Sequence, residues 1–240
     1  DLGIVVNYRN DIRFYPYRIL NFHEIVNDVV GGLPIFVTYC PLCATGVTYE
    51  RSISRGLTTF GVSGLLAQSN LLMYDRATET LWNQVSGQAV VGELTGEKLA
   101  FVPSDIVPFS IVKEQYPRAK ILSTDTGHVR DYASSPYPGY DTSTDVWFPV
   151  QKRDERLHPK TLVYGVVVDG QAKAYERSVI ESETPIIDHI GSTAISLEYD
   201  SDLQRVVVTN RNTGHLISTL PIYWFSWLAQ YPETELYVLE

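Results

Sequence analysis

Two cysteines, Cys40 and Cys43, are the residues best suited to chemistry, and they are the only cysteines in the chain. They stand in a Cys-Pro-Leu-Cys motif that follows an apolar, strand-like run at residues 35–39. Two sulfurs at this spacing can close a small disulfide ring, ligate one metal ion, or act as an attacking and a resolving thiol. The motif leaves these three chemistries open, and other residues must distinguish them.

A metal site is the first interpretation of the motif. Thiolate, thioether and imidazole groups form a soft ligand set that suits copper. A structural zinc site needs four ligands, and the chain has neither a second cysteine pair nor a paired-histidine motif, so copper ranks ahead of zinc. We expect Cys40, Cys43 and His23 to bind the ion for storage, delivery or electron transfer. Met73, the only methionine, would be a weak axial ligand, and His128 is a second-tier candidate.

The same motif supports two other hypotheses. In a thiol–disulfide or cysteine-nucleophile enzyme, Cys40 would attack, Cys43 would resolve, and His23 would serve as a base. A helix N-terminus after the motif would activate such a thiol, but residues 44–49 are rich in β-branched types and favour a strand. In a non-catalytic surface or assembly protein, the two sulfurs would form a local disulfide. The residues alone do not decide whether the chain is an enzyme.

An internal repeat distinguishes residues that occur in only one copy from residues that both copies share. Residues 25–40 align without gaps with residues 185–200, and flanking hairpin-like and short helical segments also recur. The second copy has acidic or apolar residues at the positions equivalent to Cys40, Cys43 and His23. A duplicated unit keeps in both copies what the fold requires, so we expect the first copy to carry the site and the second to act as a scaffold.

The elements that must position the site are short strands bounded by turns, with one short helix per copy ending near Pro117 and near Pro232. We predict a β-rich α+β fold of two pseudo-equivalent halves that arise from an internal duplication, the first with a long insertion. The expected boundaries are 1–122 for the first repeat unit with its insertion at about 49–90, 123–160 for an irregular linking segment, and 161–240 for the second repeat unit.

The charge balance excludes some classes of partner. The chain of 240 residues has 28 acidic and 19 basic side chains, a formal net charge of −9. Such a chain has no broad basic surface with which to bind a nucleic-acid backbone. Its apolar runs are far shorter than the roughly 20 residues that cross a bilayer, so we predict no membrane span in this chain.

The chain ends and cysteine usage suggest a compartment. The chain begins at Asp1 and its single methionine lies well inside, which predicts that an N-terminal segment was removed. The two cysteines lie close together and leave no stray thiol elsewhere, which suits an oxidising environment. We therefore expect an extracytoplasmic location, whether secreted, periplasmic or on the cell surface, with another exported protein as the partner. The sequence does not give the oligomeric state.

Several motifs occur in order along nearly the whole chain, at residues 23–28, 37–43, 60–66, 72–76, 80–82, 125–127 and 130–132. Together they resemble the bacterial and archaeal proteins grouped as domain of unknown function 3179 (DUF3179). The resemblance implies an exported protein and brings no activity with it. Its motifs include the four residues considered as the main ligands, which supports a site at these positions.

Overall fold

The computed structural model describes residues 1–239 and is mostly β, with 45% strand and 12% helix. The predicted α+β class was therefore wrong. Each helix has seven residues, about two turns, which is too short to form a layer over a sheet. No helix of the described residues is long and apolar enough to cross a membrane. The helices are α1 (Tyr17–His23), α2 (Phe109–Gln115), α3 (Arg177–Glu183) and α4 (Trp224–Gln230).

Two sheets come from the N-terminal part of the chain and from the segment that precedes the long linking loop. One has the order β12-β1-β2-β13, and the other has the order β3-β4-β5 and contains the cysteine motif at its β4–β5 turn. Their strands are β1 (Leu2–Tyr8), β2 (Asp11–Pro16), β3 (Ile25–Val30), β4 (Leu33–Cys40), β5 (Thr45–Glu50), β12 (Asp105–Pro108) and β13 (Lys120–Ile121).

A third sheet, of order β11-β10-β9-β8, lies mostly within the stretch predicted as an insertion. A two-stranded ribbon, β6-β7, precedes it. The sheet packs into the same core cluster as the cysteine motif. Its strands and those of the ribbon are β6 (Ser52–Ile53), β7 (Gly56–Leu57), β8 (Phe60–Ala67), β9 (Asn70–Asp75), β10 (Leu81–Asn83) and β11 (Ala89–Val91).

The C-terminal part of the chain forms two more four-stranded sheets, with the orders β20-β14-β15-β21 and β16-β17-β18-β19. Some local geometry recurs between the two parts of the chain. Tyr15 Oη donates to Asp28 Oδ2 at 2.8 Å, and Tyr175 Oη donates to Asp188 Oδ2 at 2.8 Å. The strands are β14 (Leu162–Val168), β15 (Gln171–Glu176), β16 (Ile186–Ile190), β17 (Thr193–Asp200), β18 (Arg205–Asn210), β19 (Leu216–Ile217), β20 (Thr219–Tyr223) and β21 (Glu235–Leu236).

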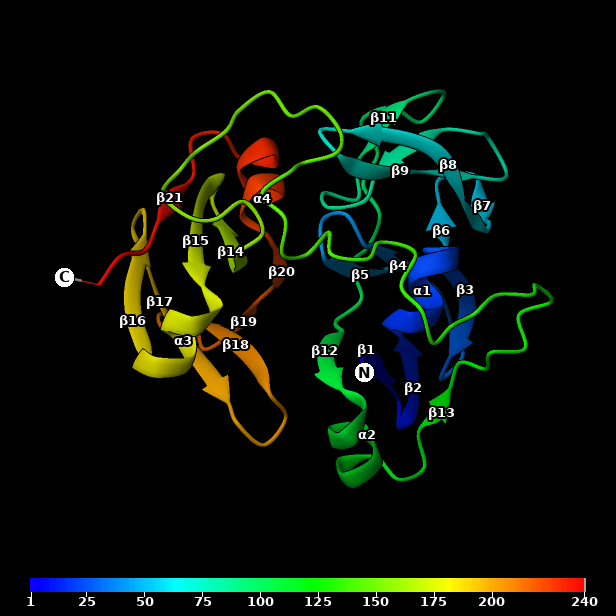
Figure 1. The fold of residues 1–240 in the computed structure, drawn as a ribbon, viewed down its shortest axis with the longest axis horizontal. Coiled ribbons are helices and arrows are strands. Elements are labelled where there is room, and N and C mark those ends of the chain that lie inside the picture. The colour runs from blue at the N-terminus through cyan, green and yellow to red at the C-terminus, as the bar shows by residue number, and fades with distance from the viewer. Residues whose placement is uncertain (240) are drawn as a thin grey trace.

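The five larger sheets are arranged like the blades of a five-bladed β-propeller, not as the two pseudo-equivalent halves that the repeat predicted (Figure 1). The sheet of β8 to β11 adds a unit that has no counterpart in the C-terminal part. Strands distant in sequence also pack across the molecule, β5 against β20 and β12 against β18. The recurrence of local elements along the chain therefore did not predict how the sheets are arranged in space.

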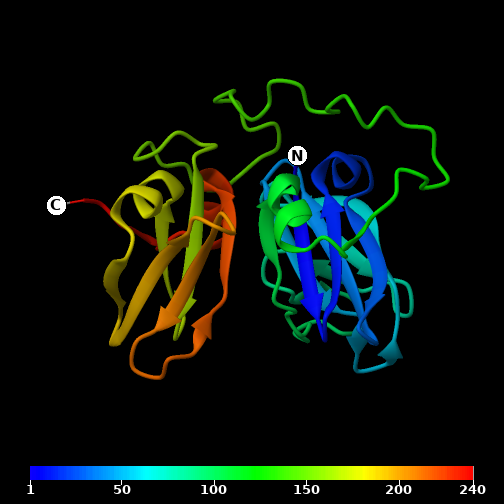
Figure 2. The ribbon, with the colours of Figure 1, turned by 90° about the horizontal axis from the view of Figure 1, so that it is seen from below.

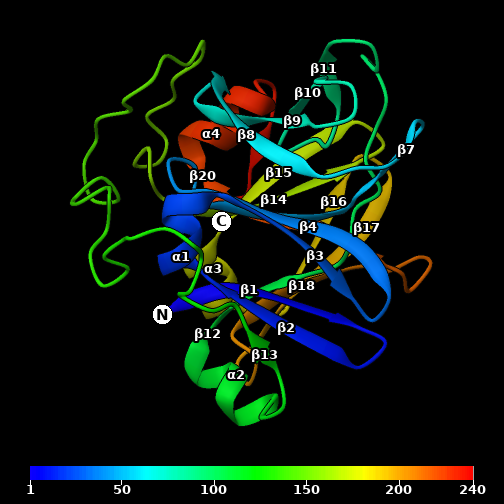
Figure 3. The same ribbon diagram turned by 90° about the vertical axis from the view of Figure 1, so that its right-hand side faces the viewer.

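Residues 122–161 contain no helix or strand and run as a long loop along one side of the molecule (Figures 2 and 3). The two short helices predicted to end near Pro117 and Pro232 are confirmed as α2 and α4. In both, the residue before the proline is the C-cap, because proline disfavours helical backbone in the residue that precedes it. The long loop connects the end of β13 with β14 and passes over the cysteine motif.

Candidate functional site

The cysteine motif forms the turn between β4 and β5. Cys40 is the last residue of β4 and pairs with Thr45, and Cys43 N donates a hydrogen bond to Cys40 O at 3.1 Å. Both cysteines are free and buried, with exposed fractions of 2% and 0%. The motif leads into strand β5, as its β-branched residues predicted, so no helix N-terminus follows it. The strand pair holds two unlinked thiols near each other inside the protein.

A second turn, between β8 and β9, lies against Cys43. Gln68 and Ser69 have φ angles of +52° and +64°, the two positive values that a type I′ turn requires. Residues other than glycine, asparagine and aspartate adopt this region rarely, so the turn places backbone strain beside the thiols. It also directs the Ser69 carbonyl at the motif, and Cys43 Sγ donates a hydrogen bond to that oxygen at 3.1 Å.

Polar groups make the two sulfurs chemically different. Burial raises the pKa of Cys43, but the polar groups of Cys40, Ser226 and Asn70 that face its sulfur outweigh burial, so the pKa of Cys43 is lowered. The pKa of Cys40 is raised well above its usual value, first by burial and then by its interaction with Cys43. Cys43 is therefore the sulfur that ionises more readily.

Three buried polar atoms beside the motif, Ser69 Oγ, Asn70 Oδ1 and Ser226 Oγ, have no hydrogen-bond partner among residues 1–239. An unsatisfied buried polar atom costs about 1–3 kcal/mol. While Cys43 is a thiol, its proton goes to the Ser69 carbonyl; as a thiolate, its sulfur would accept a hydrogen bond from Ser226 instead. The serine hydroxyls are therefore able to donate to a charged sulfur, whereas Asn70 Oδ1 can only accept from a donor or face a cation bound beside it.

Glu24 adds a carboxyl group to the same region. It follows α1 with a φ angle of +56°, and its carbonyl accepts a hydrogen bond from Tyr39 N at 2.8 Å. Burial raises the pKa of the Glu24 carboxyl to about 7. Its charge in turn raises the pKa values of Cys40 and Cys43. The Glu24 carboxylate thus opposes negative charge at the thiols, against the groups that lower the pKa of Cys43, and would favour a cation beside them.

Glu24 should give the protein a measurable pH dependence. Its pKa is about 7 in the fold against 4.5 ordinarily, so the folded chain retains a proton that the unfolded chain releases between these values. Stability is therefore fully present below the unfolded pKa and is lost as the pH rises through 7, by about 3 kcal/mol. We expect Glu24→Gln to abolish this loss and to be the more stable protein at about pH 8. Urea unfolding across this pH range measures the loss of stability. The control Glu114→Gln, at an exposed position, should lose as much stability with rising pH as the wild type does. The same loss in Glu24→Gln would contradict the assignment.

Residues 137–147, here called the cover segment, lie over the motif. Tyr140 is buried, and its hydroxyl donates a hydrogen bond to Leu42 O at 3.2 Å. Lys160 Nζ lies 3.9 Å from the centroid of the Tyr140 ring and donates hydrogen bonds to two backbone carbonyls of the segment. Trp147 packs edge-on against Tyr140 at 4.7 Å between ring centroids. These contacts fix the cover segment over the cysteine turn.

The predicted ligands fall into two groups. Met73, on β9, is fully buried and belongs to the same core cluster as Cys40 and Cys43. His23 is the last residue of α1, and its Nε2 lies 2.6 Å from Tyr132 Oη. No hydrogen bond in the described part of the chain joins His23 to a cysteine. The structure thus brings the three sulfurs into one cluster and places the imidazole in another.

That second cluster contains both histidine candidates. The ring centroids of His23 and His128 are 5.6 Å apart, and Tyr132 Oη also lies 2.6 Å from Thr126 Oγ1. Burial first, and then the charges of His128 and Arg130, lower the pKa of His23. Within residues 1–239, no group of three or more His, Cys, Asp or Glu side chains is placed to hold a metal ion. The contacts of His23 with Tyr132 and His128 join α1 to the linking loop.

Sequence reasoning missed several residues around the thiols. Glu24 directly follows His23 and Asn70 lies three residues before Met73, but neither belongs to a sequence pattern that indicates a ligand or a catalytic group. Ser226 lies in the copy expected to be a scaffold, and it reaches the motif because β20 packs against β5. Tyr223 N, at the end of β20, donates a hydrogen bond to Cys43 O at 2.9 Å. Only this long-range packing reveals the contribution of α4.

Comparison with known proteins identifies a family. A family model described as "Protein of unknown function (DUF3179)" matches residues 1–220. No curated protein and no solved structure matches the chain. The match agrees with the resemblance seen in the sequence motifs, and it covers the cysteine motif, the histidine cluster and most of the second repeat.

Proposed function

We propose, for a chain that belongs to the DUF3179 family of proteins of unknown function, that Cys40 and Cys43 bind a soft metal ion, copper(I) foremost. One observation carries the proposal: two free thiols lie near each other in a fully buried site whose polar side chains have unpartnered atoms. Buried thiols alone need no such polar surroundings, whereas a thiolate–metal unit does, because it retains charge away from water.

Copper(I) fits the donor set better than zinc. Thiolate and thioether ligands select copper(I), and both cysteines share a core cluster with Met73. Structural zinc takes four ligands, but no described group of three or more His, Cys, Asp or Glu side chains surrounds these sulfurs. A monovalent ion between two thiolates also leaves a single net negative charge, which the Ser226 hydroxyl would stabilise as a hydrogen-bond donor.

The burial of the site bears on whether the protein stores the ion, delivers it or transfers electrons through it. Binding must release the thiol protons, so uptake should strengthen as the pH rises. The site lies under the cover segment and has no exposed sulfur, which favours holding the ion over exchanging it rapidly. We therefore propose retention or slow delivery of copper as the activity. The extracytoplasmic location and the exported partner stay predictions from the sequence.

The test is metal uptake by the reduced protein under anaerobic conditions. Copper(I) is supplied as a complex with a chromophoric chelator, and the metal that co-elutes with the desalted protein is counted. We expect about one copper per chain in the wild type and none in the Cys40→Ser, Cys43→Ser double variant. Met73→Leu should bind more weakly at the same stoichiometry, and His23→Ala should match the wild type. Equal copper in the double variant, or no uptake by the reduced wild type, would overturn the proposal.

A dithiol that cycles to a disulfide is the second candidate, because both sulfurs are free and Cys43 is the more acidic. Loss of two protons and two electrons from the pair would reduce one disulfide of a partner to two thiols. The same samples separate the candidates. A metal-free wild type whose two thiols disappear on treatment with a small disulfide, and return with a reductant, would favour this candidate over copper binding.

A further inference from the structure

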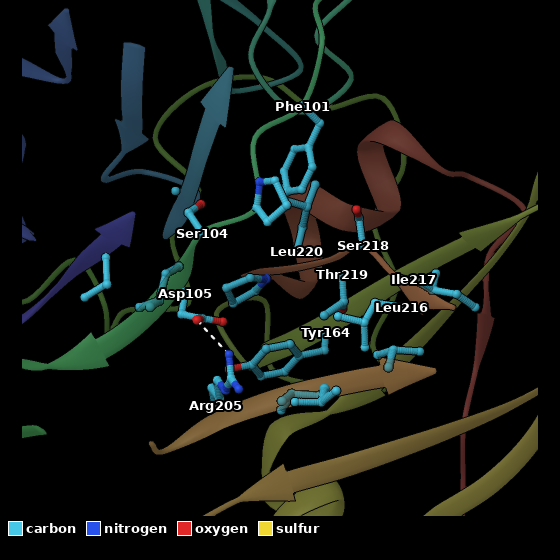
Figure 4. Close-up of a pocket in the computed structure, with 18 of the residues that line it drawn as sticks. Phe101, Ser104, Asp105, Tyr164, Arg205, Leu216, Ile217, Ser218, Thr219 and Leu220 are labelled. Atoms are coloured by element: carbon cyan, nitrogen blue, oxygen red, sulfur yellow. Dashed lines mark hydrogen bonds and ion pairs between the residues drawn. The ribbon is translucent and has the colours of Figure 1, made fainter. Parts of the chain in front are cut away.

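A cavity of about 510 Å³ lies between sheets, and its lining does not include either cysteine. Its walls come from four of the five larger sheets, through β1 and β12, β5, β14 and β20, and β18 and β19. A volume of this size is typical of sites for small organic ligands, which occur preferentially where separate packing units meet. Figure 4 shows side chains from these different elements converging on the opening.

The walls of the cavity combine apolar, aromatic and polar groups in comparable measure. Phe101 has 37% of its surface exposed, and Tyr164 is buried at the base. Leu216 and Leu220 line the C-terminal side, and Leu216 is 75% exposed. Large apolar side chains that remain exposed inside a concave site are available to bury the body of a ligand.

The charged groups of the cavity favour a cation. Asp105 and Arg205 are the only charged residues that line it, and Asp105 Oδ2 accepts a hydrogen bond from Arg205 Nη1 at 2.8 Å (Figure 4). Arg205 Nε also faces Asp200 Oδ2 at 3.4 Å. The two charged lining residues are formally neutral together, and Asp200, which does not line the cavity, is a second carboxylate facing the guanidinium. Arg205 is already paired and is a poor anchor for an anion, whereas Asp105 Oδ1 has no partner among the described residues.

We propose that this cavity binds a small organic cation, a primary amine that has an aromatic or branched apolar body. The ammonium group would pair with the free oxygen of Asp105, and the apolar body would pack on Phe101 and the leucines. The net charge of −9 on the whole chain further favours a positive ligand over a negative one.

The test compares three probes with a similar body and different charge: 2-phenylethylammonium, 2-phenylethanol and 3-phenylpropanoate. Calorimetric titration of the wild type should give an affinity at least about tenfold higher for the ammonium than for the alcohol, with the carboxylate weakest. Asp105→Asn should weaken the ammonium by about tenfold and strengthen the carboxylate, because Arg205 is then only singly paired. Asp169→Asn, the same charge change on an exposed hairpin turn, should leave all three affinities unchanged.

Phe101→Ala keeps the test decisive if Asp105→Asn does not fold. This variant should weaken the ammonium and the alcohol by similar factors, since it removes the apolar wall but no charge. The Cys40→Ser, Cys43→Ser variant should bind the ammonium normally, which separates this cavity from the copper site. The proposal is overturned if the carboxylate binds the wild type as tightly as the ammonium, if Asp105→Asn leaves the ammonium affinity unchanged, or if no probe binds at about 10 mM.

Discussion

Replacement of Asp75 by alanine is expected to lower the free energy of unfolding by about 3–5 kcal/mol. Asp75 ends β9 and is fully buried. Its carboxylate accepts hydrogen bonds from Trp82 Nε1 at 3.0 Å and from the backbone N atoms of Ala77 and Thr78 at 3.1 and 2.7 Å. Alanine would leave the indole N–H without a partner in the core and would release the turn that leads to β10. Chemical denaturation with urea gives the value directly.

The matched control is Glu93→Ala, which also removes a carboxylate. Glu93 is half-exposed and forms an ion pair with Arg55 at the surface, so its removal should change stability by less than about 0.5 kcal/mol. Asp75→Asn should fall between the two, because the amide keeps one acceptor oxygen. An Asp75→Ala protein as stable as Glu93→Ala would mean that the turn after β9 does not depend on the carboxylate.

The same substitution bears on the candidate site. Asp75 fixes the end of the strand that also contains Asn70 and Met73, and Trp82 pairs with Met73 across β9 and β10. If that strand shifts, the polar side chain beside Cys43 and the third sulfur shift with it. We therefore expect Asp75→Ala to bind copper more weakly than the wild type even under conditions in which it remains folded.

The local elements were largely accessible from the sequence. Alternating apolar residues and turn-forming pairs indicate hairpins, and the turns at Asn10 and Gly170 have the positive φ angles that such residues permit. The strand after the cysteine motif was also predictable, because Thr45, Val47 and Thr48 are β-branched. These features depend on neighbouring residues, so a single sequence contains the information.

The arrangement of the sheets was not accessible in this way. Repeat alignment shows which segments are alike but does not show which sheet edges meet, and those contacts depend on packing between distant side chains. Arg205 on β18 pairs with Asp105 on β12, and this contact joins two sheets that the repeat placed in separate halves. Helices of two turns also contribute too little apolar surface to impose an α+β arrangement.

The candidate site also has some features that the sequence predicts and others that depend on long-range packing. Spacing alone predicted that Cys40 and Cys43 lie together, because the strand turn is local. Spacing could not show that His23 faces Tyr132, since these two residues are brought together only by the long loop. Nor could it show that Ser226 reaches the cysteine turn from the last helix. The soft-ligand composition led to the copper hypothesis, and tertiary packing determines which of those residues lie together.

Tyr140→Ala is expected to increase the rate of alkylation of the two cysteines by about 100-fold or more under native conditions. The thiols are buried, so a reagent reaches them only when the protein opens locally. Tyr140 contributes to keeping the motif closed through its packed ring and its hydrogen bond to Leu42 O at 3.2 Å. Loss of a buried aromatic side chain costs about 3–5 kcal/mol, and each 1.4 kcal/mol taken from a local opening reaction raises the open population tenfold.

The measurement is the rate at which iodoacetamide modifies the reduced, metal-free protein, followed by intact mass. Tyr140→Phe is the matched control: it keeps the ring and loses only the hydrogen bond, so its rate should rise by less than about tenfold. Tyr116→Ala, at the end of α2 and away from the cover segment, should react like the wild type. If Tyr140→Ala matched the wild type, the reagent would enter by another route. A large increase confined to Tyr140→Ala would instead show that the cover segment controls access to both sulfurs, and a bound metal ion would then have to pass beneath it.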